Sequence, residues 1–122
     1  MKHLLLVIYC PEKYSEIIKQ AAFSEGAGII GNYEECAWQT HGTGQFKALS
    51  NSNPFVGTIS QNHKEDEIKV EMLIKTNIKN QVVQAVKNAH PYETPLIYTV
   101  RIDVWNSNQL SHLLASMLCY SL

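Results

Sequence analysis

The stretch AHPYETP, residues 89–95, places an imidazole, a phenol and a carboxylate around two prolines. Each proline restricts its own backbone and disfavours the α region in the residue before it, so these residues form a short rigid connector after a predicted helix. His90 can neutralise the C-terminal end of that helix, whereas the carboxylate of Glu93 is repelled there and needs another partner. The stretch is therefore first a helix-to-strand corner and second the rim of a binding site.

A metal ion is one possible partner for this connector, with His90 and Glu93 as the candidate ligands. Two ligands are fewer than the three or four that hold a divalent ion, so the site would need help from His41, His63, Cys36 or another subunit. Imidazole and carboxylate ligands suit zinc, copper or nickel. We favour the structural connector over this ligand set, and the divalent metal ion stays an alternative.

A second stretch with possible binding residues is YEECAWQTHGTGQFKAL, residues 33–49, which is rich in aromatics, threonine and spaced glycines. It has no helical period and predicts a twisted strand or hairpin with a break at its two central glycines, Gly42 and Gly44. We expect the connector to lie beside this segment, with the Tyr92 side chain buried, its hydroxyl paired, and Glu93 facing a cation or a cleft. The candidate ligand-binding residues are Tyr33, Trp38, His41 and Tyr92.

Known catalytic and cofactor motifs are missing from the rest of the sequence. GAGIIG, residues 26–31, has the letters of a dinucleotide-binding fingerprint but closes a predicted helix, where the fingerprint would open one, so we interpret it as a helix stop and turn. The sequence contains no P-loop, HExxH, GxSxG or CxxC motif. Hydrolase and kinase activities are not indicated.

Composition favours one soluble cytoplasmic domain, residues 1–122. Ten basic and eleven acidic residues give a net charge of −1, and the scattered lysines do not form a nucleic-acid-binding footprint. Three widely spaced cysteines indicate a reducing compartment. No apolar run approaches the roughly 20 residues of a membrane span, and the first one, near the N-terminus, is better interpreted as a buried strand than as a signal peptide.

Hydrophobic periodicity predicts an α+β, ferredoxin-like (split βαβ) fold: an antiparallel sheet with two helices on one face, an inserted hairpin and an extra C-terminal helix. QNHKEDE, residues 61–67, is expected to be a solvated loop, and Asn77 is expected to cap the second helix. The first helix should bury one stripe of apolar residues. The predicted strands are 4–9, 68–74 and 96–105, the predicted helices are 11–26, 77–89 and 108–119, and the stripe is Tyr14, Ile17, Ile18, Ala21 and Ala22.

Three stretches in order, GAGIIGNYEECAWQTHGTGQF, NPFVG and AHPYETP, resemble the insertion domain of the YqfO-type (Nif-three-like) proteins, which are related to GTP cyclohydrolase I type 2. The resemblance implies a CutA-like and PII-like domain that assembles as a trimer. It does not transfer two-metal chemistry, because the metal ligands of that family lie in the flanking domain. Thr94 also replaces the second glutamate of the usual HPYEE pattern.

Our leading hypothesis is a non-catalytic, homo-oligomeric binding or regulatory module of the CutA/PII-like type. The alternative is a cation-tolerance protein with a divalent-metal site between subunits, formed by His90, Glu93 and His41. An enzyme with an unrecognised site is a third hypothesis. The apolar stripe of the C-terminal helix, within residues 107–122, should be buried on the open side of the sheet or at a subunit contact.

Overall fold

The structure, a computed structural model, describes residues 2–105. Four strands form one antiparallel sheet in the order β2-β3-β1-β4, and a single 3₁₀ turn precedes each of the two helices. The elements are β1 (His3–Pro11), α1 (Ser15–Ser24), β2 (Trp38–Lys47), β3 (Asn62–Lys75), α2 (Lys79–Ala89) and β4 (Ile97–Ile102). The predicted ferredoxin-like fold is confirmed. The predicted hairpin is formed by β2 and β3, which are two of the four strands of the sheet.

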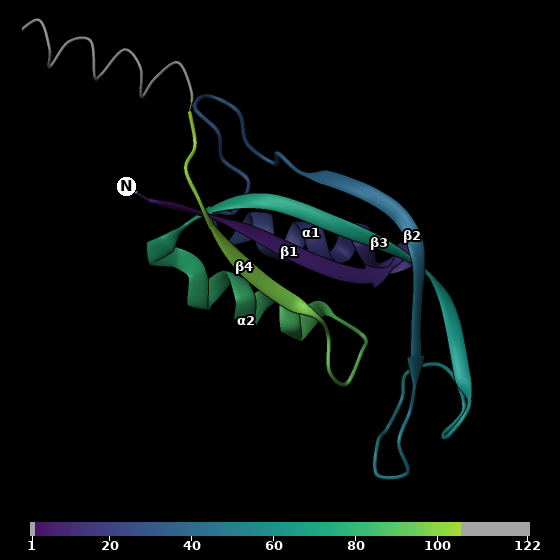
Figure 1. Cartoon of the computed structure of the whole chain (residues 1–122). Helices are drawn as coiled ribbons and strands as arrows, with labels where there is room; N and C mark the ends of the chain where they lie inside the picture. Colours follow the sequence, from purple (N-terminus) through teal and green to yellow (C-terminus); the bar gives the residue numbers. More distant parts are fainter. Residues whose placement is uncertain (1, 106–122) are drawn as a thin grey trace, which may run out of the picture.

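Both helices lie on one face of the sheet, and the core fills the space between them (Figure 1). Alternate residues of β1 and β3 point toward the helices, as the period of a strand requires. Val82 and Val86 of α2 and Ile18 of α1 close the core from the other side. The strand residues of this core are Leu4, Leu6, Ile8, Cys10, Ile68, Val70, Met72 and Ile74.

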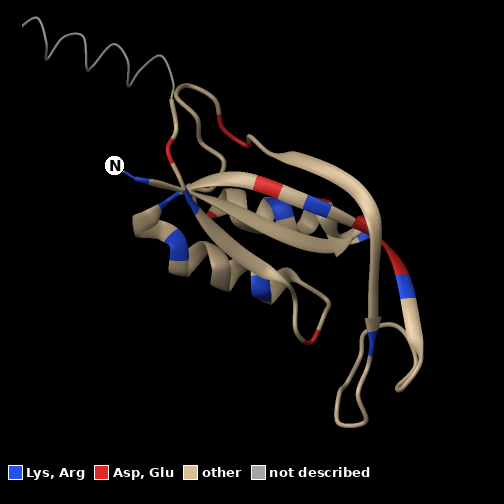
Figure 2. Cartoon of the chain, in the orientation of Figure 1, with Lys and Arg blue, Asp and Glu red and all other residues tan. Residues whose placement is uncertain are grey.

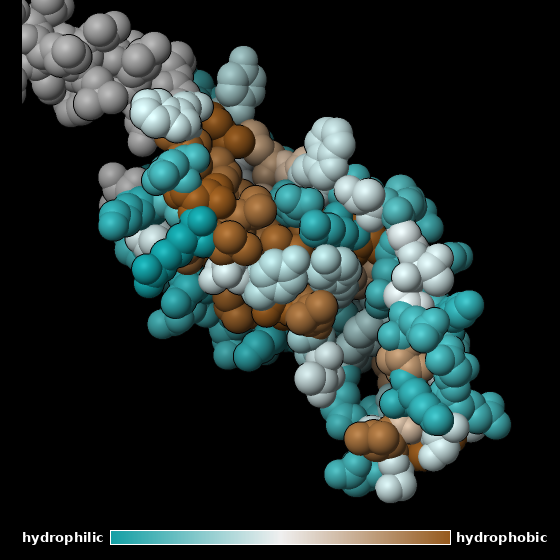
Figure 3. Space-filling model, in the orientation of Figure 1, coloured by the Kyte–Doolittle hydropathy of each residue, from teal (hydrophilic) through white to brown (hydrophobic). Residues whose placement is uncertain are grey.

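Neither of the helices within residues 2–105 covers the opposite face of the sheet, yet this face carries apolar side chains (Figure 3). Tyr98 and Val100 of β4 lie opposite Val7 and Leu5 of β1, so all four share this face. Tyr98 and Val100 are 38% and 43% exposed. The strand predicted at 96–105 therefore turns Tyr98 and Val100 toward the open face, where they are only partly buried.

The β2–β3 hairpin extends beyond the sheet as an arm, because residues 67–75 of β3 pair with β1 whereas residues 62–66 pair with β2 alone (Figure 1). The prediction of a loop at 61–67 was therefore wrong. A two-stranded ribbon is solvated on both faces and needs no apolar alternation, so its sequence looks like a loop. The predicted break at Gly42 and Gly44 was also wrong, since both glycines lie within β2 and pair with β3.

Two details of the predicted helices need correction. Ile17 is 59% exposed, because the buried stripe of α1 consists of Ser15, Ile18 and Ala22. Asn77 does not cap α2: it lies inside the 3₁₀ turn before the helix, and the cap residue Ile78 makes no side-chain hydrogen bond. The predicted C-terminal helix falls outside residues 2–105.

The glycines of GAGIIG form a turn, as predicted. Gly26, Gly28 and Gly31 have φ of 99°, 80° and 56°, in the left-handed region that favours glycine. Gly28 donates its N–H to the Leu73 carbonyl at 2.8 Å and accepts from the Cys36 N–H at 2.8 Å, which ties the turn to β3. A side chain at Gly28 would meet that Cys36 backbone.

Within residues 2–105, neither helix has the length and apolar character needed to cross a membrane.

Candidate ligand-binding pocket

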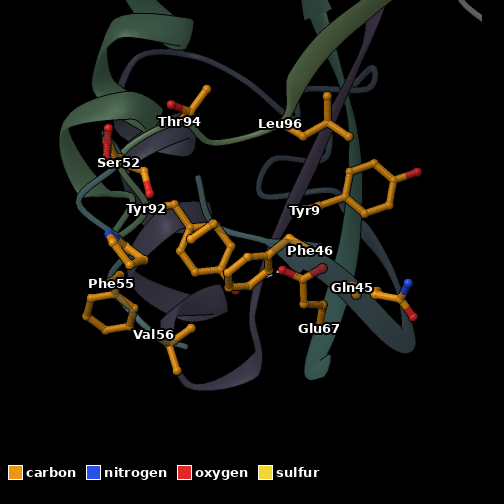
Figure 4. Close-up of a pocket in the computed structure, with 14 residues that line it drawn as sticks. Tyr9, Gln45, Phe46, Ser52, Phe55, Val56, Glu67, Tyr92, Thr94 and Leu96 are labelled. Atoms are coloured by element: carbon orange, nitrogen blue, oxygen red, sulfur yellow. Dashed lines mark hydrogen bonds between the residues drawn. The ribbon is translucent and has the colours of Figure 1, made fainter. Parts of the chain in front are cut away.

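A pocket of about 450 Å³ lies where the arm, the 48–61 loop and the connector after α2 meet (Figure 4). Its walls come from segments far apart in the sequence, which only the folded sheet brings together. Four aromatic rings and two carboxylates are among its lining. The rings are those of Tyr9, Phe46, Phe55 and Tyr92, and the carboxylates are those of Glu67 and Glu93.

Tyr92 is the central side chain of this pocket. Its hydroxyl donates a hydrogen bond of 2.8 Å to Oε2 of Glu67, which confirms that the hydroxyl is paired. Burial raises the pKa of Tyr92 well above its usual range, and the hydrogen bond to the Glu67 carboxylate raises it further. The phenol therefore stays neutral and acts as a fixed donor.

Gly44 provides the space for the carboxylate of Glu67. The two residues lie on the same face of the arm, and a Cβ at position 44 would overlap Oε1 and Cδ of Glu67. Because Oε2 receives the Tyr92 hydroxyl, the other oxygen lies over the bare glycine backbone. The glycine thus lets a carboxylate lie flat against the floor of the pocket.

His90 lies beside Tyr92, and its ring is held by two hydrogen bonds. Nδ1 accepts from the Tyr92 backbone N–H at 3.2 Å, so the proton is on Nε2, which lies 2.7 Å from the Tyr9 carbonyl and donates to it. Burial lowers the pKa of His90, against the opposing effects of this backbone hydrogen bond and of Glu67. The imidazole is therefore neutral and anchors the connector to β1, and it does not serve the carboxyl end of α2.

Glu93 joins the connector to the 48–61 loop. Its Oε2 accepts a hydrogen bond of 2.6 Å from the Asn53 N–H. The loop is closed at its base by the Ser60 N–H, which donates to the Ala48 carbonyl at 2.7 Å. Glu93 faces the cleft, as expected, and holds the loop that forms the outer wall.

Aromatic rings surround Tyr92 on several sides. Its ring centroid lies 6.5 Å from that of Phe46 and 6.2 Å from that of Phe55, and the His90 ring is 5.0 Å away. Phe55 in turn makes an edge contact with Tyr14, at 5.6 Å. These separations fit the preferred distances of aromatic pairs, so the walls are preformed.

The four candidate ligand-binding residues do not converge. Tyr92 lines the pocket, but Tyr33 and Trp38 are 75% and 70% exposed elsewhere. Trp38 pairs with Glu71 on the open face, and His41 pairs with Ile68 on the helix face. An odd separation along a strand puts two side chains on opposite faces, so Trp38 and His41 cannot share a site within one subunit.

The pocket also contains residues that the sequence did not single out. Phe46, Phe55 and Glu67 are among the residues that line it. Residues 63–67 are all polar, so no apolar alternation marked this part of β3 as a strand.

Both proposed metal ligands make hydrogen bonds within the chain. His90 uses both ring nitrogens within the chain, and Glu93 contacts the loop. Among residues 2–105, no group of three or more histidine, cysteine, aspartate or glutamate side chains could hold a metal ion.

Comparison with known proteins relates the chain to part of a larger protein. No family model matches it. It is 39% identical over 89 residues to the GTP cyclohydrolase 1 type 2 homolog of Mycobacterium tuberculosis, which covers 73% of this chain and 24% of that protein. The homolog of Bacillus subtilis is 34% identical over 88 residues, with 72% and 24% covered. The chain spans about a quarter of the length of these relatives.

Solved structures agree with this relation. A Bacillus cereus protein related to NIF3 has a TM-score of 0.73 at 27% identity, over 84% of this chain and 26% of its own. The periplasmic divalent cation tolerance protein CutA of Archaeoglobus fulgidus has a TM-score of 0.64 at 17% identity, over 89% and 92%. The second likeness shows a shared fold. The resemblance seen in three stretches of sequence is thereby confirmed.

Proposed function

We propose that this chain, a relative of one segment of the NIF3-like proteins with the fold of CutA, is a non-catalytic, oligomeric binding or regulatory module of the cytoplasm. The preformed pocket at Tyr92 carries the proposal. Concave, mostly apolar sites with a few fixed polar groups are the usual form of small-molecule sites. The resemblance to CutA and PII-like domains supports the same class.

A binding role fits the pocket better than catalysis because its titratable groups are engaged in holding the structure. The Glu67 carboxylate accepts from Tyr92, the Glu93 carboxylate accepts from the loop, and the His90 imidazole bridges two backbone segments. A general base must be free to take a proton from its substrate. These three groups instead fix the shape of the pocket.

Assembly through the open face is the second part of the proposal, with a trimer as the form that the resemblance implies. The partly exposed apolar residues of this face, Leu96, Tyr98 and Val100, form a patch of the kind that marks a protein contact. A Val100→Lys variant should shift the mass in native mass spectrometry from a trimer to a monomer. Ile17→Lys, at a more exposed apolar position on α1, is the matched control and should leave the assembly intact. A wild-type protein that is monomeric at micromolar concentration would contradict the assembly.

Binding can be tested without knowing the ligand. A small-molecule library screened by ligand-observed NMR should give hits that compete with one another for the wild-type protein. Phe55→Ala removes one wall of the pocket and should abolish these hits, while Ile17→Ala, outside the pocket, should retain them. A library without any hit that depends on Phe55 would remove the pocket as the binding site.

A divalent metal ion is the second candidate, and the name of the CutA neighbour, a divalent cation tolerance protein, is the observation in its favour. A site using His90 would have to break one of the two hydrogen bonds of its ring. Elemental analysis of protein purified without a histidine tag should find a stoichiometric metal if the site exists. A His90→Ala variant should then lose it, and a metal-free wild type would end this candidate.

A further inference from the structure

We propose that the pocket at Tyr92 accepts a small organic cation, an amine with an apolar or aromatic body. The inference rests on the proposed binding function and specifies its ligand class. Three features support it: the sign of the charge in the lining, the aromatic walls, and the free oxygen of a fixed carboxylate.

The charge of the lining has one sign. Two of the fourteen described lining residues are acidic, Glu67 and Glu93, and none of the fourteen is a lysine, arginine or histidine. The chain as a whole carries a net charge of only −1, so this bias is local. Figure 2 shows acidic residues at the base of the arm and on the connector. A phosphate or carboxylate ligand would meet two like charges and no counter-charge.

The walls suit the apolar part of a cation. Phe46, Phe55 and Tyr92 present ring surfaces to the cavity, and Tyr9 and Leu96 extend the apolar lining (Figure 4). An ammonium group is attracted to the face of an aromatic ring, and the attraction grows when water is displaced. A metal ion would gain little from rings, whereas an organic amine can use the rings and the carboxylate together.

Glu67 is placed to receive the charged end of such a ligand. Tyr92 bonds Oε2 and holds the carboxylate in position, which leaves Oε1 over Gly44 as an acceptor for an ammonium N–H. The absence of a side chain at Gly44 makes room for that oxygen on the floor of the pocket. A carboxylate fixed before binding loses little entropy when the ligand arrives.

Three probes of similar size test the charge directly: benzylammonium, benzyl alcohol and phenylacetate, titrated into the intact wild-type protein and followed by two-dimensional NMR. Benzylammonium should shift the resonances of Tyr92, Phe46 and Phe55 in a saturable way. Benzyl alcohol should bind about tenfold more weakly, because it lacks the charge-assisted bond, and phenylacetate should not bind.

Glu67→Gln keeps an oxygen acceptor for the Tyr92 hydroxyl while it removes the charge. It should weaken benzylammonium about tenfold and leave benzyl alcohol within about twofold. Glu16→Gln, which removes a carboxylate on α1 outside the pocket, should change neither affinity. Equal affinities for benzylammonium and phenylacetate, or an unchanged benzylammonium affinity in Glu67→Gln, would overturn the proposal that the ligand is a cation. The pocket would still be a binding site in either case. If none of the three probes shifts the pocket resonances, the inference fails, and Phe55-dependent library hits would show that the proposed function survives it.

Discussion

Replacing Tyr92 with phenylalanine removes one hydroxyl and keeps the ring contacts with Phe46 and Phe55. A hydrogen bond to a charged group contributes about 1.5–3 kcal/mol to the free energy of unfolding. The Tyr92–Glu67 bond is 2.8 Å long and only part-buried, so water can reach the freed carboxylate and the lower end of the range applies. We expect Tyr92→Phe to lower stability by about 1.5 kcal/mol, or the midpoint of thermal unfolding by about 5 °C.

Tyr33→Phe is the matched control, because it removes the same hydroxyl from a tyrosine that is 75% exposed and lies outside both the pocket and the proposed subunit contact. The loss of this hydroxyl should cost less than about 0.5 kcal/mol. Urea unfolding at one protein concentration measures both variants, and a double-mutant cycle of Tyr92→Phe with Glu67→Ala should give a coupling energy of about 1 kcal/mol. Equal stabilities of the two phenylalanine variants, or a coupling energy within error of zero, would refute the role of this bond.

Two further substitutions test the anchors of the pocket and of the glycine turn. The folded-state pKa of His90 is lowered, so the unfolded chain binds a proton first and the wild type should lose stability as the pH falls below about 6.5. His90→Gln, which keeps an amide donor, should make this pH dependence shallower in urea unfolding at pH 5 and 7.5; an unchanged slope would contradict a buried neutral ring. Gly28→Ala places a methyl group 2.9 Å from the Cys36 carbonyl oxygen at a φ of 80°. It should cost about 2 kcal/mol, while Gly42→Ala, with open space around it, should cost nothing measurable.

The sheet and helices were predictable because their residues obey one period each. Ile68, Val70, Met72 and Ile74 alternate along β3, and every one of them is buried against the helices. The alternation of β4 was equally clear, but the period does not tell which face of a sheet is covered. Tyr98 and Val100 face the open side, where they suggest a subunit contact, whereas Ile97 packs against the core.

The pocket was predictable only at the connector. The two prolines fixed the connector that holds Tyr92, and its hydroxyl was expected to be paired. Its partner Glu67 lies 25 positions earlier, in a segment whose polarity hides a strand. Which long-range segments meet depends on the register of β2 with β3, and the sequence of a solvated ribbon contains little information about register.

The order in which the strands are made has a consequence for the newly synthesised chain. The apolar strand β1 comes before both of its neighbours, and it pairs with β3 and then with β4, which ends at Ile102. During translation β1 therefore keeps at least one unpaired edge until the last described strand leaves the ribosome. Contacts of such separation form slowly and leave apolar strands open to aggregation. We expect ribosome-bound chains that stop before β4 to depend on chaperones, and chains that extend well past it to resist proteolysis.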